Sequence, residues 1–281
     1  MLTEITFELP HIKLAGLTNN QQGKPVILAL HGWLDNAASF STIATSFEDY
    51  HFIALDLPGH GKSDHRDGKG GYFFADWVKD VVELIIAKQW ETPFLLGHSM
   101  GGMIATTVAA TFPELIAGVV LIESVGLVTT DISDTTAQLR KAIKARLALS
   151  TKEAPVHKTI ESAISARCSA SDFSAEIAEI LVSRGLMACE GGYTWRTDMR
   201  LRHPSAMRFS PQQAAEIIQN IEHNVLLLKA ENGYQMISKN MALFEKDYKN
   251  LTIINVPGGH HCHLEYPGLL AEHILNFIRK I

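Results

Sequence analysis

The pentapeptide Gly-His-Ser-Met-Gly at residues 97–101 has the residue types and spacing that best suit covalent chemistry in this chain. Residues 93–96 before it are typical of a short buried strand, and residues 102–110 after it are typical of a helix. A Gly-x-Ser-x-Gly turn between a strand and a helix holds its serine in a strained, exposed position. The backbone N–H of Met100, at the start of the helix, can then donate to an oxyanion. We therefore predict that Ser99 is a nucleophile.

A serine hydroxyl is a poor nucleophile at neutral pH, so Ser99 needs a base within hydrogen-bond reach, and that base needs an orienting partner. Histidine suits this role because its pKa lies near neutral pH. Three histidines, His260, His261 and His263, follow the last strand that the sequence predicts. A Ser-His pair of this kind would form an acyl-enzyme intermediate.

Alternating strands and helices surround the pentapeptide and must position it. Apolar runs in which few polar residues alternate with apolar ones predict strands that are buried on both faces. These runs are residues 25–30, 52–57, 93–96, 118–122, 225–228 and 251–256, with a hairpin over residues 5–16 before them and helices over residues 74–85, 211–221, 241–248 and 274–281. The alternation predicts an α/β protein with a mostly parallel sheet covered by helices on both faces.

The pattern changes between residues 128 and 210, where helical spacings replace the strand–helix alternation. Leu139, Ile143 and Leu147 mark one helix, and Ile160 and Ile164 mark another. Beyond this segment the alternation resumes. We therefore interpret residues 128–210 as a helical cap inserted after the sixth strand, and residues 1–127 and 211–281 as the core.

Composition limits the classes of partner. The 281 residues are 46% hydrophobic and 20% charged, as in ordinary globular proteins. The 25 basic and 30 acidic residues give a net charge of −5, and no basic run is present, so we expect no nucleic-acid partner. No segment has the pattern of a signal peptide or a membrane span. Three cysteines without paired spacing suit a reducing compartment, so we expect a cytoplasmic protein that acts on a small molecule. The sequence leaves the oligomeric state open.

We expect neither a cofactor nor a metal. The tripeptide Gly61-Lys62-Ser63 resembles the end of a phosphate-binding loop, but Asp56 occupies the position of that motif's first glycine. The histidines at residues 260–263 have no second group of ligands with matched spacing.

Several segments together resemble the α/β-hydrolase superfamily, most closely its serine hydrolase-like branch. They are residues 31–40, 56–63, 97–102, 195–201 and 259–260. The resemblance implies the α/β-hydrolase fold, with a second oxyanion donor in the loop after the strand at residues 25–30, which is the Trp33 backbone N–H. It also implies the chain order serine, acid, histidine, which makes His260 the base and leaves His261 and His263 to packing or cap contacts.

The acid is where the chain departs from the superfamily's pattern, because its usual Gly-x-x-Asp is here Ala-Glu-Asn-Gly at residues 230–233. Neighbouring strand ends allow either Glu123 or Glu231 to approach His260. Glu123 directly follows an apolar strand, where a carboxylate is costly unless it is paired. Glu231 precedes an Asn-Gly pair that is typical of a solvated turn. We predict that Glu123 is the acid; Glu231, Asp198 or no acid at all remain as alternatives.

The predicted activity is that of a serine hydrolase with a Ser-Glu-His triad. Trp33, Met100 and the cap would enclose an apolar pocket of modest size, so we expect a small to medium, largely apolar carboxylic ester or a related acyl compound. An acyltransferase or perhydrolase on the same site, or a catalytically silent fold that binds a ligand, are the alternatives. The superfamily acts on a wide range of substrates, so the resemblance implies a catalytic apparatus more than a substrate.

Overall fold

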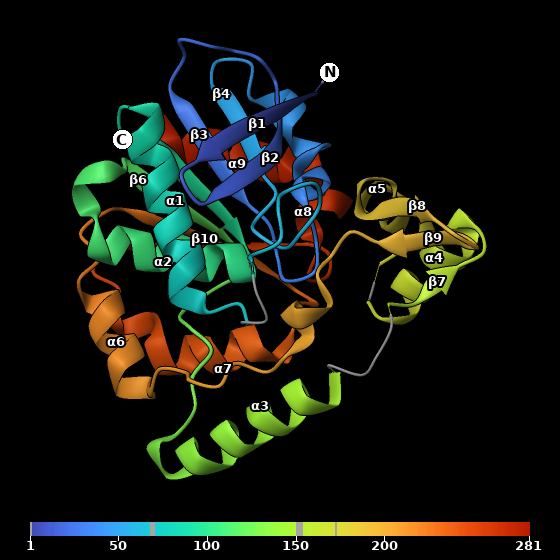
Figure 1. Ribbon diagram of the computed structural model, residues 1–281. Helices are drawn as coiled ribbons and strands as arrows, with labels where there is room; N and C mark the ends of the chain where they lie inside the picture. The colour runs from blue at the N-terminus through green and yellow to red at the C-terminus, as the bar shows by residue number, and fades with distance from the viewer. Residues whose placement is uncertain (1, 68–70, 150–153, 172) are drawn as a thin grey trace.

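A twisted central sheet organises the computed structural model, which describes residues 2–67, 71–149, 154–171 and 173–281 (Figure 1). Its eight strands lie in the order β1-β2-β4-β3-β5-β6-β10-β11. The strands are β1 (Thr3–Leu9), β2 (Ile12–Thr18), β3 (Val26–Leu30), β4 (His51–Leu55), β5 (Phe94–His98), β6 (Gly118–Ile122), β10 (Val225–Ala230) and β11 (Leu251–Val256). β1 pairs antiparallel with β2, and β2 pairs antiparallel with β4, whereas the strands from β4 to β11 pair in parallel.

The central strands are buried on both faces, as their apolar runs predict. Every residue of β3 and β6 is buried, and so are the last four residues of β4 and β5. The parallel register places Leu30 of β3 beside Gly97 of β5, and His98 beside Ile122 of β6. The carboxyl ends of these strands therefore meet at one edge of the sheet, which is where ligands bind in open α/β sheets.

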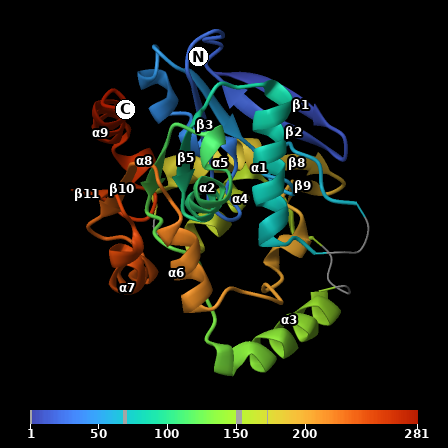
Figure 2. The ribbon, with the colours of Figure 1, turned by 90° about the vertical axis from the view of Figure 1, so that its left-hand side faces the viewer.

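Helices cover both faces of the sheet, and α1 and α9 lie on opposite sides of the molecule (Figure 2). One apolar cluster receives side chains from α1 (Phe74–Lys88), α2 (Met100–Thr111), α6 (Pro211–Gln219) and α7 (Gln235–Phe244). A second cluster, on the other face, receives them from the short helices η1 (Ala37–Phe40) and η2 (Ile43–Ser46) and from α9 (Pro267–Ile278). The predicted α/β-hydrolase fold is confirmed. None of the helices in the described residues is long and apolar enough to cross a membrane.

The segment between β6 and α6 is inserted after the sixth strand, as the sequence predicts, but it is not wholly helical. It contains α3 (Thr135–Leu149), α4 (Ile160–Ser169) and α5 (Ala175–Gly185). It also contains a small sheet of β7 (Val156–His157), β8 (Leu186–Cys189) and β9 (Gly192–Trp195), in the order β7-β9-β8. The sequence analysis missed this sheet because strands of two and four residues are too short to show an alternating pattern. Figure 1 shows these strands beside α4 and α5, whereas α3 lies apart from them.

Short helices complete the connections. They are η3 (Pro113–Leu115), η4 (Ile132–Asp134), η5 (Met199–Arg202), η6 (Glu245–Asp247) and α8 (Cys262–Glu265). α7 begins at Gln235 and ends at Phe244, earlier than the predicted helix over residues 241–248. Its early start leaves residues 231–234 as the connection between β10 and α7, with Tyr234 directly before the helix.

Candidate active site

Ser99 lies in the turn between β5 and α2 and has a strained backbone. Its φ of 49° and ψ of −116° lie outside the regions that residues with a side chain commonly occupy. Hydrogen bonds hold the turn in this conformation: the Ser99 N–H donates to the Ile122 carbonyl oxygen (3.1 Å), and the Ser124 hydroxyl donates to the Ser99 carbonyl oxygen (2.7 Å). The end of β6 and the residues that follow it thus hold Ser99 in its strained conformation.

The two glycines of the pentapeptide leave room for this turn. A Cβ atom at Gly97 would lie 2.4 Å from the Gly102 Cα, and one at Gly101 would lie 2.0 Å from the Leu30 carbonyl oxygen. Both separations are far below van der Waals contact, and both clashes involve backbone that cannot move aside. The Gly-x-Ser-x-Gly pattern is therefore required by the packing of α2 against β3 and β5.

His260 and Glu123 form a buried pair beside this turn. His260 lies in the loop after β11, and its Nδ1 is 3.3 Å from Oε2 of Glu123, which directly follows β6. Glu123 is fully buried, and its Oε1 accepts a hydrogen bond from the Ala230 N–H (2.7 Å). When Nδ1–H donates to a carboxylate, the Nε2 of a neutral imidazole carries a lone pair, which is the tautomer that a general base needs.

The alternative acids lie elsewhere. Glu231 is exposed, and its backbone N–H continues the sheet by donating to the Val256 carbonyl oxygen (2.9 Å). Asp198 accepts a hydrogen bond from the Tyr72 hydroxyl (2.8 Å) and forms an ion pair with Arg200 (2.6 Å). Although burial opposes it, the hydrogen bonds from Arg200 hold the pKa of Asp198 below its usual value. Of the three candidate carboxylates, the structure brings Glu123 to His260.

Gly233, at the position where the superfamily's pattern has aspartate, explains the departure from that pattern. A Cβ atom built on Gly233 would lie 2.1 Å from Oε2 of Glu123. The Glu123 carboxylate therefore occupies the space into which a side chain at position 233 would project. A glycine at this position is what the placement of Glu123 requires.

Two further side chains position His260, and the sequence analysis gave neither of them a role. The Tyr234 ring stacks on the imidazole, with ring centroids 3.9 Å apart and planes 10° apart. His98, inside the pentapeptide, donates from Nε2 to the His260 carbonyl oxygen (2.9 Å), because a carbonyl can only accept. In the sequence, Tyr234 directly follows Gly233 and His98 directly precedes Ser99. Neither position alone indicates that these side chains contact His260.

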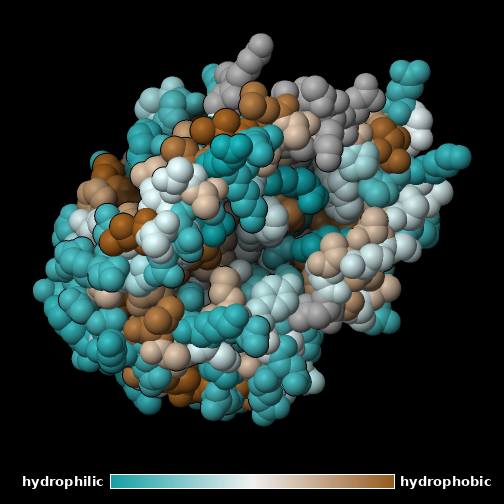
Figure 3. All heavy atoms as spheres, turned by 90° about the horizontal axis from the view of Figure 1, so that it is seen from below, coloured by the Kyte–Doolittle hydropathy of each residue, from teal (hydrophilic) through white to brown (hydrophobic). Residues whose placement is uncertain are grey.

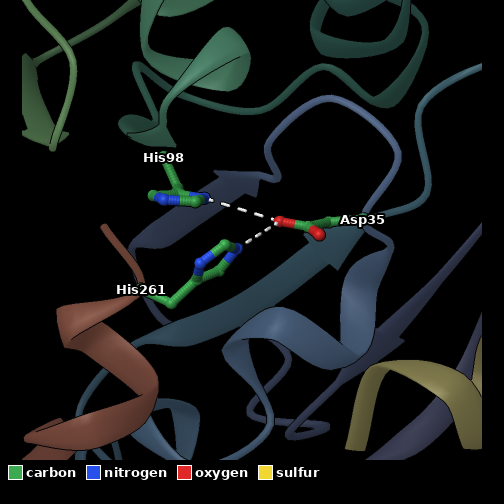
Figure 4. A group of neighbouring side chains, drawn as sticks. All are labelled: Asp35, His98 and His261. Carbon is green, nitrogen blue, oxygen red and sulfur yellow. Dashed lines mark hydrogen bonds and ion pairs between the residues drawn. The ribbon is translucent and has the colours of Figure 1, made fainter. Parts of the chain in front are cut away.

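A network around Asp35 supports the same loop (Figure 4). His261 Nε2 and His98 Nδ1 are 3.2 Å and 3.7 Å from Asp35 Oδ2, and Arg167 Nη2 is 2.5 Å from Asp35 Oδ1. Although Asp35 is buried, His261 and Arg167 hold its pKa well below the usual range. Burial, together with His263 and His260, lowers the pKa of His98 and keeps it neutral. His263 makes a separate contact, with its Nε2 2.7 Å from the Ser39 hydroxyl oxygen.

The ligand atoms of Asp35, His98 and His261 lie within 4.8 Å of one another, a spacing that could hold a metal ion. However, the Arg167 guanidinium already balances the Asp35 charge, and a His261 N–H can donate to the other carboxylate oxygen. Protein groups thus balance the Asp35 charge, and we assign the network a positioning role.

Two backbone N–H groups remain available near Ser99. The Met100 N–H lies in the first turn of α2, where no intrahelical acceptor exists, and the Trp33 N–H lies in the loop after β3. Among the described residues, neither group donates to a protein acceptor. The Trp33 indole N–H donates to the Leu201 carbonyl oxygen (3.0 Å), which ties this loop to the inserted segment.

A cavity of about 580 Å³ connects the core and the inserted segment. Ser99 and His260 line it together with Trp33, but Met100 is not among its lining residues. The inserted segment lines it with Pro155, His157, Ala166, Arg167, Ala170, Ser171, Trp195, Thr197 and Arg202. Viewed from below, the molecular surface mixes hydrophilic and hydrophobic side chains around a hollow (Figure 3). The catalytic candidates therefore face a space that the inserted segment partly encloses.

The fold is that of an α/β hydrolase, and residues 25–156 match the alpha/beta hydrolase fold family. The predicted resemblance to the α/β-hydrolase superfamily, and to its serine hydrolase-like branch, is confirmed.

Two relatives and one solved structure illustrate this similarity. The chain is 29% identical to a serine hydrolase-like protein of Danio rerio over 99% of this chain and 88% of the relative. It is 28% identical to serine hydrolase-like protein 2 of Homo sapiens over 99% and 95%. The chain is also 38% identical in sequence to a hypothetical protein from Pseudomonas aeruginosa PAO1, whose crystal structure is similar with a TM-score of 0.91 over 98% of this chain and 99% of that chain. These similarities support a hydrolase of the α/β family.

Proposed function

We propose that this protein is a serine hydrolase that cleaves a small to medium, largely apolar carboxylic ester, or a related acyl compound. The observation that carries the proposal is the shared cavity of Ser99 and His260, in which the His260 imidazole is paired with the buried Glu123 carboxylate. This is the set of groups that a serine needs in order to act as a nucleophile at neutral pH.

In the proposed mechanism, His260 Nε2 takes the Ser99 proton while the Ser99 oxygen attacks the ester carbonyl. The N–H groups of Trp33 and Met100 stabilise the oxyanion, and the Glu123 carboxylate stabilises the imidazolium. The imidazolium then gives its proton to the leaving alcohol, which leaves an acyl-enzyme. Water, activated by His260, hydrolyses this intermediate and restores Ser99.

The cavity supports the proposed substrate class. Its volume of about 580 Å³ lies within the usual range for small-molecule sites, and Trp33, Leu34, Ala166 and Trp195 give it apolar walls. We propose that residues 128–210 act as the cap that limits access of water and substrate. We also propose a small-molecule substrate and a cytoplasmic location, as the composition suggests.

Covalent labelling tests this proposal. A fluorophosphonate probe should label the wild-type protein, and Ser99→Ala should abolish both the labelling and the hydrolysis of p-nitrophenyl esters, while circular dichroism shows an intact fold. Esterase activity retained by purified Ser99→Ala would contradict the mechanism. Adding an alcohol or hydrogen peroxide distinguishes hydrolysis from acyl transfer or perhydrolysis, because those acceptors would divert the acyl group. A wild-type protein that no probe labels would instead be a silent ligand-binding fold.

A further inference from the structure

Two arginines line the cavity, and their surroundings differ. The Arg167 guanidinium is engaged on both sides, by Asp35 Oδ1 (2.5 Å) and by the Ser171 hydroxyl oxygen (2.7 Å). The Arg202 side chain is exposed, and across the described ranges of the chain it forms no hydrogen bond or ion pair. Arg202 therefore offers this cavity a guanidinium whose donors have no acceptor among the described residues.

The charges along the cavity are not balanced. Asp35 contributes one carboxylate, which Arg167 neutralises, and no other acidic residue within the described ranges lines the cavity. The described lining residues thus carry one excess positive charge, although the whole chain has a net charge of −5. A positive site in an acidic protein favours anionic ligands locally.

The backbone holds Arg202 in a defined place. Arg202 is the last residue of η5, whose first turn is capped by the Asp198 side chain accepting from the Arg200 N–H (2.9 Å). The preceding residue, Leu201, accepts the hydrogen bond from the Trp33 indole. Arg202 is thus fixed next to the loop that carries one of the proposed oxyanion donors.

His157 is the second residue whose polar atoms bear on ligand binding in this cavity. It lies on β7 and lines the same cavity, and its ring packs edge-on against Trp195 (5.5 Å between centroids). Its Nε2 atom is buried and has no hydrogen-bond partner among the residues that the structure describes. Leaving a buried polar atom unsatisfied is costly, and an acceptor on a bound ligand would remove that cost.

We propose that Arg202, assisted by His157, binds a carboxylate at the end of the substrate that is remote from the scissile carbonyl. The preferred substrate is then an ester with an apolar body and one anionic end, such as a half-ester of a dicarboxylic acid. A planar guanidinium pairs with a carboxylate through two parallel hydrogen bonds, and a single negative charge matches the single excess positive charge. This inference rests on the proposed function, because it defines a substrate for the same site.

Matched ester pairs test the proposal by kinetics. Mono-p-nitrophenyl adipate is compared with its neutral methyl ester, and 4-carboxyphenyl hexanoate with its neutral methyl ester, so that the charge lies on the acyl side or on the alcohol side. The wild-type kcat/KM should be about 10- to 100-fold higher for the anionic member of one pair. Arg202→Gln should remove this preference, so that kcat/KM for the anionic ester falls to the value for its neutral partner. Arg140→Gln, on the exposed face of α3, is the control and should keep the preference.

Binding to an inactive variant separates the two proposals. Calorimetry should show that Ser99→Ala binds monomethyl adipate at least about tenfold more tightly than Ser99→Ala/Arg202→Gln does. Equal binding by these two variants, or an anionic preference that survives Arg202→Gln, would overturn the carboxylate site. Failure of Ser99 labelling with normal carboxylate binding would instead contradict the proposed hydrolase alone.

Discussion

Replacing Glu123 by glutamine changes one atom of the candidate triad and has an outcome that the structure specifies. One Glu123 oxygen accepts from the Ala230 N–H, and the other faces His260 Nδ1. In Glu123→Gln the amide oxygen would keep the Ala230 N–H, since that N–H can only donate. The amide NH₂ would then face Nδ1, which must become the acceptor. This places the imidazole proton on Nε2, the atom that must receive the Ser99 proton.

The expected loss follows from this wrong tautomer. The equivalent change in the serine protease triad lowers kcat about 10⁴-fold, and we expect a loss of about 10³- to 10⁴-fold here. That range corresponds to roughly 4 to 5.5 kcal/mol of transition-state stabilisation. The fold should survive because glutamine has the same shape as glutamate. The measurement is kcat for one p-nitrophenyl ester, with thermal unfolding and circular dichroism on the same samples.

Glu231→Gln is the matched control because Glu231 is exposed and lies directly after β10. It should behave almost as the wild type does. A large loss in Glu231→Gln, with Glu123→Gln close to wild type, would refute both the assignment and the tautomer argument.

Two further outcomes are expected. His260→Ala should abolish ester hydrolysis, whereas His261→Ala and His263→Ala should retain measurable kcat, because these two side chains contact Asp35 and Ser39; an inactive His261→Ala that is folded would contradict the choice of His260. Acid should also destabilise the protein, because burial lowers the pKa of both His60 and His263 to about 3. The unfolded chain then binds more protons below a pH of about 6.5, so stability is complete above this pH and decreases as the pH falls towards 3, by about 1.4 kcal/mol per pH unit for each histidine. Urea unfolding at pH 7, 6 and 5 measures this slope, and a free energy of unfolding that does not change with pH would disprove it.

The sequence predicted the parallel sheet and the candidate nucleophile because both depend on local patterns. An uninterrupted apolar run such as β6 identifies a strand that is buried on both faces, and the glycines around Ser99 identify the strained turn. The pairing of Glu123 with His260 was predictable because a carboxylate directly after that run needs a partner.

The contacts around His260 could not be read from local patterns. Asp35 and His261 are 226 positions apart in the chain, and the Trp33 indole contacts a carbonyl 168 positions away. The stacking of the Tyr234 ring depends on where α7 begins, and the place of Arg202 depends on how η5 packs. The short strands β7 to β9 are recognised by their pairing with one another.

The close approach of Gly233 to Glu123 has a consequence for how such chains are classified. The ends of β6 and β10 deliver side chains into one volume, which has room for a carboxylate from either strand but not from both. Under the proposed assignment of Glu123 as the acid, a glycine at position 233 is therefore no sign of lost catalysis. Under that assignment, a search that requires aspartate after β10 would miss this chain, whereas a search that reads positions 123 and 233 together would keep it.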